Sequence, residues 1–397
     1  MPGPLHGYRI VDLTSNVSGP LATMILGDQG AEIIKVEAPE GDHTRAGANR
    51  RGGFSVNFLN NNRNKRSVVL NLKHKAALDA LKRLAMTADV FVQNFRPGVA
   101  ERIGVGEEAI RAVKPDIVYV SISGFGEKGP YAQKPVYDPL IQGFSGLATV
   151  QAGSDEARPR MLRTILPDKL TAITASQAIT AALLARARTG EGQHVRLSML
   201  EAVLAFLWAS DMGSQTYVGA GDQDGPVRQE AASSTDLVYE TADGYITAAV
   251  QTNRQWEGLT RALDRPEWLD DPRFKTPALR AENVEARLQL TQDVLIGGTS
   301  AEWLDKLTRA DVPCAPVLTR NEVIRHPHVA ALEIVEEYDH PAAGRLRQSR
   351  AAARFSKTPP AIQRGAPALG QDTDAVLGEI GYSSEQIAGL RAEGATG

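Results

Sequence analysis

The sequence predicts an α/β fold whose larger part is a doubly wound parallel sheet. Short apolar segments alternate with helical segments over residues 9–123, and strands separated by helices pair in parallel. Polar loops follow several of the apolar segments. The chain has 397 residues, more than one ordinary core holds, so two domains are expected.

The expected strands of this sheet are short and apolar. They cover residues 9–13, 31–37, 67–72, 89–93 and 117–123. A first helix is expected at 21–27, with Ser18 as its N-cap and Pro20 near its first turn, and a second helix at 74–87. Ligands of such sheets bind beyond the carboxyl ends of the strands. The loops expected at that edge are 16–20, 94–97 and 124–126.

The chain changes character near residue 217. Residues 217–230 are rich in Gly, Asp and Gln, which indicates a linker or a lid. Beyond them, two alternating segments flank Asp243-Gly244, a typical hairpin turn. Helices are expected around 254–263, 284–295, 301–309, 377–380 and 384–390. The expected division is a large domain over 1–216, a linker with a small α+β domain over 217–325, and a last segment over 326–397.

Composition excludes several classes of protein. With 42% hydrophobic and 23% charged residues, the chain has the composition of a globular protein, and its net charge of -3 gives no reason to expect a nucleic-acid partner. Residues 1–8 show no basic region followed by an apolar core, so no secretory signal is expected. No membrane span is expected either, because Thr171, Thr174 and Ser176 interrupt the helix after Asp168.

The cysteine and histidine residues argue against disulfides and metals. Cys314 is the single cysteine, so no internal disulfide forms, and a cytoplasmic location is expected. A lone cysteine is typically a small buried hydrophobic residue. His326 and His328 flank Pro327 without a cysteine or carboxylate cluster nearby, so we expect no metal site.

Two familiar phosphate-binding motifs are absent. A strand, a turn, a helix and a strand ending at Glu37 are typical of a dinucleotide fold. The glycine fingerprint is missing, since residues 15–27 contain only Gly19 and Gly27, which argues against a nicotinamide dehydrogenase. The polar and basic run at 60–66 is either a solvated loop or a loop that meets phosphates.

Asp168 is the most informative single residue. It follows Pro167 and opens a long apolar helical stretch at 170–187. A carboxylate there meets unpaired backbone N–H groups and the positive end of the helix dipole, so it is expected to be ionised. Asp168 is either an ordinary helix cap or a nucleophile.

Short segments spread along the chain carry a further signal. They are 11–13 leading to 19–20, 31–37 with 41–42, 64–67 with 70–73, 94–98, 123–126, 137–139, 189–193 and 313–317. In this order they resemble the family III CoA-transferases, the group that includes formyl-CoA transferase, carnitine CoA-transferase and 2-methylacyl-CoA racemase. The resemblance covers nearly the whole chain.

The resemblance implies a CoA-transferase in which Asp168 matches the catalytic aspartate. Such an enzyme moves coenzyme A between an acyl-CoA donor and a carboxylic acid acceptor. The aspartate forms a mixed anhydride with the acyl group and then an aspartyl-CoA thioester, which splits one difficult step into several easier ones. Coenzyme A and acyl-CoA are substrates, and no permanently bound cofactor is implied.

The resemblance also implies binding residues. Val17, Tyr137 and Asp138 match positions near the acyl group. The positions implied for coenzyme A are Ser18, Leu70, Leu72, Lys73, Asn94, Phe95, Arg96, Arg102 and Lys134. Lys134 matches less closely because Pro135 is inserted before Val136, and Arg102 and Lys134 are otherwise simple surface charges. Val17 replaces a glutamine of formyl-CoA transferase, which favours an acyl group less polar than formyl or oxalyl.

The resemblance also implies an architecture: a large Rossmann-like domain built from both chain ends, a small α+β domain between them, and an interlinked homodimer.

Two alternatives to the transferase stay open. A 2-methylacyl-CoA racemase needs two proton-transfer groups, but Tyr137 stands where such relatives have a histidine. The other alternative is a CoA-binding protein without catalysis.

Overall fold

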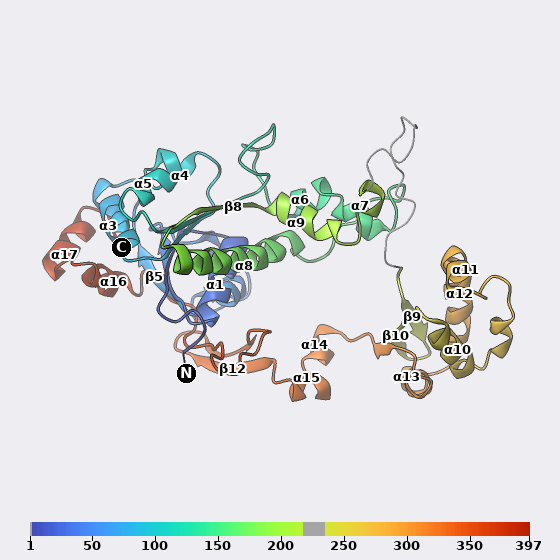
Figure 1. Ribbon diagram of the computed structural model, residues 1–397. Helices are drawn as coiled ribbons and strands as arrows, with labels where there is room; N and C mark the ends of the chain where they lie inside the picture. The colour runs from blue at the N-terminus through green and yellow to red at the C-terminus, as the bar shows by residue number, and fades with distance from the viewer. Residues whose placement is uncertain (1, 217–234) are drawn as a thin grey trace, which may run out of the picture. The chain divides into compact units, whose positions relative to one another are not determined.

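The computed structural model describes residues 2–216 and 235–397, so the segment expected as a linker or lid lies outside the described residues. The chain divides into two compact units (Figure 1). The larger unit combines Met1–Ser233 with Glu333–Gly397, and the smaller unit is Ser234–Leu332.

Six parallel strands form the central sheet of the larger unit. Their order across the sheet is β5 (Lys65–Val69), β2 (Glu32–Glu37), β1 (Arg9–Asp12), β6 (Val90–Gln93), β7 (Val118–Ser123) and β8 (His194–Ser198). In chain order this is 3-2-1-4-5-6, the order of the doubly wound dinucleotide-binding fold. The order reverses between β1 and β6, where such sheets bind ligands. The expectation of an α/β fold with a parallel sheet is confirmed.

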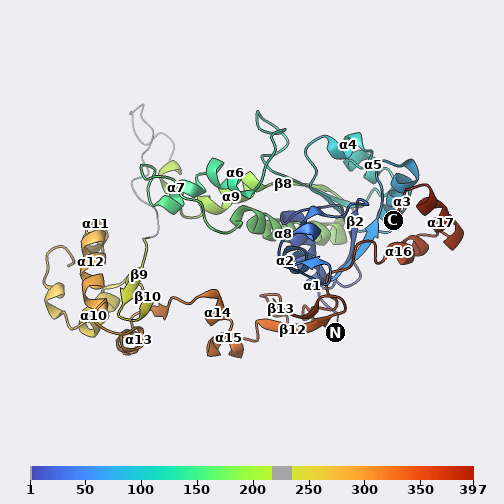
Figure 2. The same cartoon turned by 180° about the vertical axis from the view of Figure 1, so that it is seen from behind.

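Helices cover both faces of the sheet (Figures 1 and 2). On one face, Ile10 and Val92 pack against α1 (Ser18–Asp28) and α8 (Leu166–Thr189). On the other face, Val11 and Phe91 belong to a core that includes residues of α3 (Lys75–Met86), α16 (Thr373–Glu379) and α17 (Ser384–Ala392). Successive strand residues thus enter opposite cores, as the two-residue period of a strand requires.

The remaining elements of the larger unit are short. They are η1 (His43–Ala46), β3 (Arg50–Arg51), β4 (Phe54–Ser55), α2 (Val56–Asn61), α4 (Val99–Arg102), α5 (Glu107–Arg111), α6 (Asp138–Phe144), α7 (Leu147–Ala152), α9 (Met199–Trp208), η2 (Gly213–Gln215), β12 (Val335–His340) and β13 (Gly344–Ser349). The last segment returns to the edge of the sheet, where the backbone N–H of Ser67 donates to Asp372 (2.9 Å) and the Thr396 hydroxyl donates to the carbonyl of Val69.

Helix α1 starts differently from the prediction. Ser18 is the first helical residue, Val17 is the N-cap, and no side chain caps this helix, so the expected Ser18 cap is wrong. Asn16 adopts a left-handed conformation (φ 72°), and the carbonyl of Val17 accepts the first helical hydrogen bond from the N–H of Leu21 (2.8 Å). Ser18 instead interacts with the Asp168 carboxyl and opposes the rise in its pKa that burial causes.

The smaller unit is a compact α+β body. Its antiparallel sheet contains β9 (Val238–Thr241), β10 (Gly244–Ala248) and β11 (Cys314–Pro316), and the hairpin expected at Asp243-Gly244 is confirmed. Its helical segments are α10 (Asn253–Ala262), η3 (Pro266–Leu269), α11 (Pro277–Glu282), α12 (Val284–Leu295), α13 (Ser300–Arg309), α14 (Arg320–Val323) and α15 (Pro327–Ala331). Cys314 packs, partly buried, against a core that includes Trp256 and Trp303.

Helix α8 departs from the expectation about membrane spans. It has 24 residues and a mean hydropathy of 1.2 over its most apolar window, enough by length and composition to cross a membrane. In this structure Ala172, Ala175, Ile179 and Leu183 are buried in the core that α8 shares with α1 and the sheet. A core helix passes the same test, because it too must be apolar along its length.

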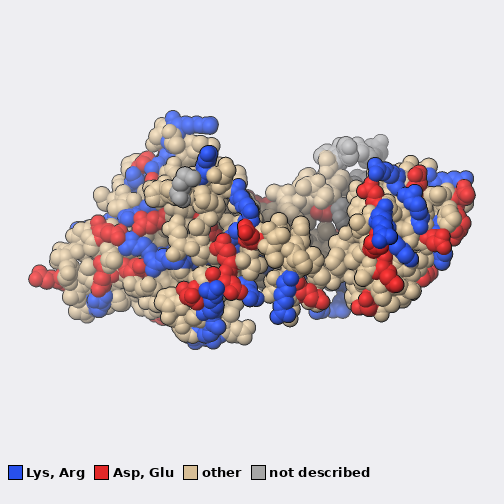
Figure 3. Space-filling model, turned by 90° about the horizontal axis from the view of Figure 1, so that it is seen from below, with Lys and Arg blue, Asp and Glu red and all other residues tan. Residues whose placement is uncertain are grey.

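On the face drawn in Figure 3, Lys and Arg side chains are interspersed with Asp and Glu.

Candidate functional site

Asp168 lies in the first turn of α8. Ile165 is the N-cap, Leu166 is the first helical residue, and no side-chain hydrogen bond caps this helix. The interpretation of Asp168 as a helix cap is therefore wrong: the helix begins two residues before it, with Pro167 in its first turn. Because the Asp168 carboxylate does not cap the helix, it is available for other chemistry.

Asp138 holds the backbone of Asp168. Its Oδ2 accepts the backbone N–H of Asp168 (3.1 Å), and its Oδ1 accepts from Nε2 of Gln142 (2.7 Å). Asp138 opens α6 with Tyr137 as N-cap and is only 3% exposed, whereas Tyr137 is 64% exposed. Gln142 also donates to the carbonyl of Thr164 (3.0 Å), so α6 is tied to the segment that enters α8.

The pKa of both carboxyl groups is raised. Burial, and then the charge of Asp138, raise the pKa of Asp168 to about 6, against the lowering effect of hydrogen bonds from the side chain and backbone of Ser18. Burial also raises the pKa of Asp138, with the hydrogen bond from Gln142 opposing. The expectation that the helix terminus keeps Asp168 readily ionised is wrong in direction, because lost hydration and a like charge outweigh the helix dipole. A perturbed carboxyl in a pocket is typical of a functional site.

The loop before α1 brings Val17 and Ser18 to Asp168. Asn94 follows β6 and fixes this loop: its Oδ1 accepts the backbone N–H of Ser15 (3.0 Å) and its Nδ2 donates to the carbonyl of Ser15 (2.9 Å). The Asn94 side chain therefore joins the ends of β1 and β6, where the strand order reverses.

A buried ionic network supports the same loop from below. Lys35 donates to the carbonyl of Thr14 (2.8 Å), and Lys65 donates to the carbonyl of Pro20 (2.9 Å) and to Asp12 (2.9 Å). Asp12, Lys35 and Lys65 are completely buried. Burial alone would raise the pKa of Asp12, but Lys65 and Lys35 outweigh it and hold that pKa well below its usual range.

These segments enclose a small cavity, which we call the aspartate pocket. Its volume is about 230 Å³. Six of the predicted site residues line it: Val17, Ser18, Asn94, Tyr137, Asp138 and Asp168. They come from the starts of α1, α6 and α8 and from the end of β6, so residues far apart in sequence meet in one place.

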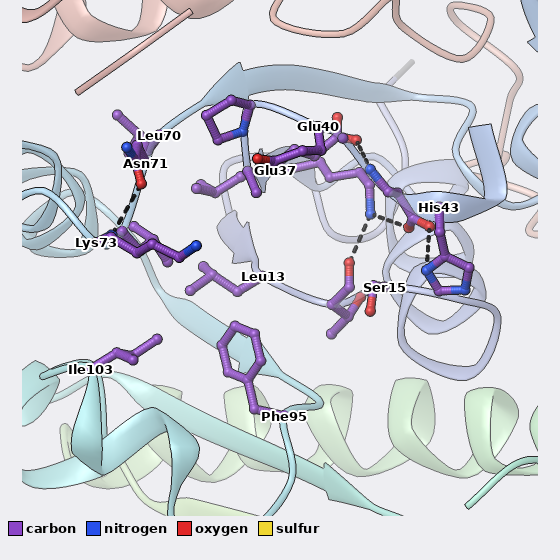
Figure 4. Close-up of a pocket in the computed structure, with 18 of the residues that line it drawn as sticks. Leu13, Ser15, Glu37, Glu40, His43, Leu70, Asn71, Lys73, Phe95 and Ile103 are labelled. Carbon is purple, nitrogen blue, oxygen red and sulfur yellow. Dashed lines mark hydrogen bonds and ion pairs between the residues drawn. The ribbon is translucent and has the colours of Figure 1, made fainter. Parts of the chain in front are cut away.

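A second cavity lies at the carboxyl ends of β1, β2, β5 and β6 (Figure 4), and we call it the strand-end cavity. Its volume is about 740 Å³. Five more predicted residues line it: Leu70, Leu72, Lys73, Phe95 and Arg102. In Figure 4, Lys73 and Phe95 approach the same space from different strand ends, with Leu13 between them. The lining also includes Lys35, Glu37, Glu40 and Asp42, of which Asp42 pairs with Lys35 and Glu37 pairs with Arg45. Apolar walls with the cations of Lys73 and Arg102 suit a ligand that has a flat apolar part and anionic groups.

Two predicted residues lie elsewhere. Arg96 lines a separate hollow of about 550 Å³ together with His194 and Arg196, and Phe95 contributes to both this hollow and the strand-end cavity. Lys134 lines none of these three cavities, and its ammonium lies 3.5 Å from the centre of the Tyr131 ring.

Sequence reasoning missed the supporting residues. Gln142 carried a readable signal, because residues four apart on a helix are neighbours and Asp138 is its partner. Lys35 and Lys65 carried a weaker signal, because they are lysines inside otherwise apolar strands. Within residues 2–216 and 235–397, no group of three or more His, Cys, Asp or Glu side chains could hold a metal ion.

Known proteins resemble this chain along nearly all of its length. The model of CoA-transferase family III matches residues 5–373. Human succinyl-CoA:glutarate CoA-transferase is 34% identical over 399 residues, covering 98% of this chain and 89% of the relative. Formyl-CoA:oxalate CoA-transferase of Escherichia coli is 30% identical over 419 residues, covering 98% and 99%. The crystal structure of a CAIB/BAIF family protein from Brucella suis matches with a TM-score of 0.81 and 29% identity, covering 96% of this chain and 100% of that one.

Proposed function

This chain belongs to CoA-transferase family III and is therefore an enzyme of the CoA-transferase class, and from that premise we propose that it moves coenzyme A from an acyl-CoA donor to a carboxylic acid through covalent intermediates on Asp168. The observation that carries the proposal is the Asp168 carboxyl, which lines a pocket beside Ser18 with its pKa raised to about 6. An incompletely solvated carboxylate is a stronger nucleophile than one in water.

The proposed reaction balances without a cofactor. The Asp168 carboxylate attacks the thioester carbonyl and the C–S bond breaks. The CoA thiolate departs, and the acyl group and Asp168 are then joined in an acyl–aspartyl anhydride. The thiolate attacks the Asp168 carbonyl, releases the donor acid and leaves an aspartyl-CoA thioester. The acceptor carboxylate then reverses both steps and frees Asp168. Holding the anhydride beside the thiolate supplies roughly 7–11 kcal/mol of the barrier lowering through proximity.

We assign the two cavities to the two parts of acyl-CoA. The acyl carbonyl lies in the aspartate pocket near Val17, Tyr137 and Asp138. The nucleotide lies in the strand-end cavity, where Lys73 and Arg102 supply cations for phosphates. The other proposed contacts to coenzyme A are Ser18, Leu70, Leu72, Asn94, Phe95, Arg96 and Lys134. The side chain of Asn94 bonds to Ser15, so it serves the site through the loop that it fixes.

We also propose an interlinked homodimer in the cytoplasm. Large apolar side chains stand exposed on α6, α8 and α9 of the single chain, which supports a covering partner: Leu140, Phe144, Ile173, Phe206 and Trp208. Light scattering should give twice the 42.7 kDa of one chain. Interlinked subunits cannot exchange without unfolding, so native mass spectrometry of mixed labelled and unlabelled dimers should show no mixed species; rapid exchange would refute the interlinking.

The transferase is tested by isotope exchange. The purified protein is incubated with an acyl-CoA and the corresponding ¹³C-labelled free acid, and label in the thioester is followed by mass spectrometry. The relatives named for glutarate and oxalate make these acids the first candidates. The wild type should exchange label, Asp168→Ala should not, and hydroxylamine with acyl-CoA should modify Asp168. Binding of acyl-CoA without exchange would support a non-catalytic protein, and α-deuterium uptake from heavy water would support a racemase.

A further inference from the structure

A third cavity adjoins the aspartate pocket, and we call it the basic cavity. Its volume is about 530 Å³. Val17 and Ile165 line both the basic cavity and the aspartate pocket, so these two side chains form the common wall. The two cavities are therefore neighbours on either side of Val17 and Ile165.

The two cavities differ in charge. The described residues that line the basic cavity include Arg63, Lys169 and Arg347 and no Asp or Glu. Those that line the aspartate pocket include Asp138 and Asp168 and no Lys or Arg. An anionic group is therefore repelled from the aspartate pocket and attracted to the basic cavity.

Of the three cations that line the basic cavity, Lys169 is the one without a salt bridge to any described residue. Arg63 is already paired with Asp28 (2.9 and 2.6 Å), and Arg347 is paired with Glu337 (2.8 Å). The ammonium of Lys169 donates to the neutral hydroxyl of Thr164 (2.8 Å), and its charge partly offsets the burial that raises the pKa of Asp138, without forming a salt bridge with that carboxylate. Lys169 directly follows Asp168 in α8, so the cation and the nucleophile are carried by the same helical turn.

The boundary between the cavities is apolar. Val17 and Ile165 line both cavities, and Leu21 and Met24 of α1 also line the basic cavity. Hydrocarbon is the chemistry that such a surface favours, and a carboxylate placed on it would lose hydration without gaining a partner.

We propose that the basic cavity binds the far carboxylate of a dicarboxylic acyl group whose methylene segment lies along Val17 and Ile165. One carboxyl reacts at Asp168 as acid or thioester, and the other meets Lys169. The substrate class is an α,ω-dicarboxylic acid with several methylene groups. Oxalic acid has no methylene segment and does not reach Lys169. This inference rests on the proposed transferase, because it needs the reacting carboxyl at Asp168.

The test compares a diacid with a monoacid of equal chain length. Glutaryl-CoA with ¹³C-glutarate and pentanoyl-CoA with ¹³C-pentanoate are exchanged separately, so each acid has its own thioester. The wild type should exchange glutarate at least 10-fold more efficiently in kcat/KM than pentanoate. Lys169→Met should lower that preference at least 10-fold, chiefly by raising KM for glutarate, and Lys169→Arg should retain most of it.

Lys82→Met is the matched control, because Lys82 belongs to α3, the helix that packs on the opposite face of the sheet. It should keep the wild-type preference, and circular dichroism should show that all variants are folded. Equal exchange of both acids by the wild type, or equal losses for both acids in Lys169→Met, would overturn the inference while the transferase stands. Absence of exchange with every acid tried would overturn the transferase itself, and the inference with it.

Discussion

The backbone N–H of Asp168 donates to the carboxylate of Asp138 at 3.1 Å. The same carboxylate that fixes the position of Asp168 also opposes its ionisation, since the charge of Asp138 raises the pKa of Asp168. The position and the pKa of the Asp168 carboxyl are therefore linked through one neighbouring side chain.

The first prediction concerns pH. Because the pKa of Asp168 is raised to about 6, its carboxyl is protonated and unreactive below that pH and ionised above it. The value of kcat/KM for CoA transfer should therefore fall as the pH drops through about 6. Asp138→Asn removes the opposing charge but keeps an oxygen for the Asp168 N–H, so this decline should move to lower pH. An unchanged pH profile in Asp138→Asn would contradict the coupling.

The second prediction concerns stability. A carboxyl with a raised pKa in the folded state favours folding when protonated, and this contribution is lost as pH rises from the unfolded value of 3.8 through about 6. Asp168→Asn removes the free-energy cost of ionising this carboxyl in the folded state, which is at most about 3 kcal/mol. At about pH 8, Asp168→Asn should raise the apparent Tm by a few degrees while abolishing transfer. Calorimetry near pH 3, below both pKa values, supplies the control, because the difference should vanish there. An equal gain at both pH values would contradict the explanation.

The third prediction concerns the buried ion pair beneath the loop of Val17. Lys65→Met leaves the Asp12 carboxylate buried without its ammonium partner at 2.9 Å and frees the carbonyl of Pro20. Breaking a buried pair on one side typically costs about 3–5 kcal/mol of unfolding free energy. The double variant Asp12→Asn/Lys65→Met should recover part of that loss in urea unfolding. Simple additivity of the two single losses would show that the pair is not coupled.

The fourth prediction separates the two parts of the coenzyme. Lys73→Met and Arg102→Met each remove a cation from the strand-end cavity. A hydrogen bond to a charged group contributes about 1.5–3 kcal/mol, so KM for acyl-CoA should rise roughly 10-fold or more. Acyl-pantetheine lacks the nucleotide, and its KM should be the same in the variants and the wild type. An equal rise for both thioesters would place the nucleotide elsewhere.

Local pattern was sufficient for much of the fold. The strands β1, β2, β6 and β7 and the helix α3 lie within one or two residues of their predicted ranges. In each of them the pattern of apolar side chains along the chain indicates which residues are buried. Strand β8 (His194–Ser198) was not predicted. It lies at the edge of the sheet and is only partly buried, so its pattern is weak.

Within the site, the sequence singled out Asp168, and its resemblance to the family grouped Val17, Ser18, Tyr137 and Asp138 with it. It could not say in which direction the pKa of Asp168 shifts, because that depends on the distance to a carboxylate thirty positions away and on water excluded by three helices. Nor could it pair Lys65 with Asp12, or set Lys169 beside a cavity without acidic groups. Periodicity and residue type act through neighbours along the chain, whereas electrostatics acts through space and exists only once the chain has folded.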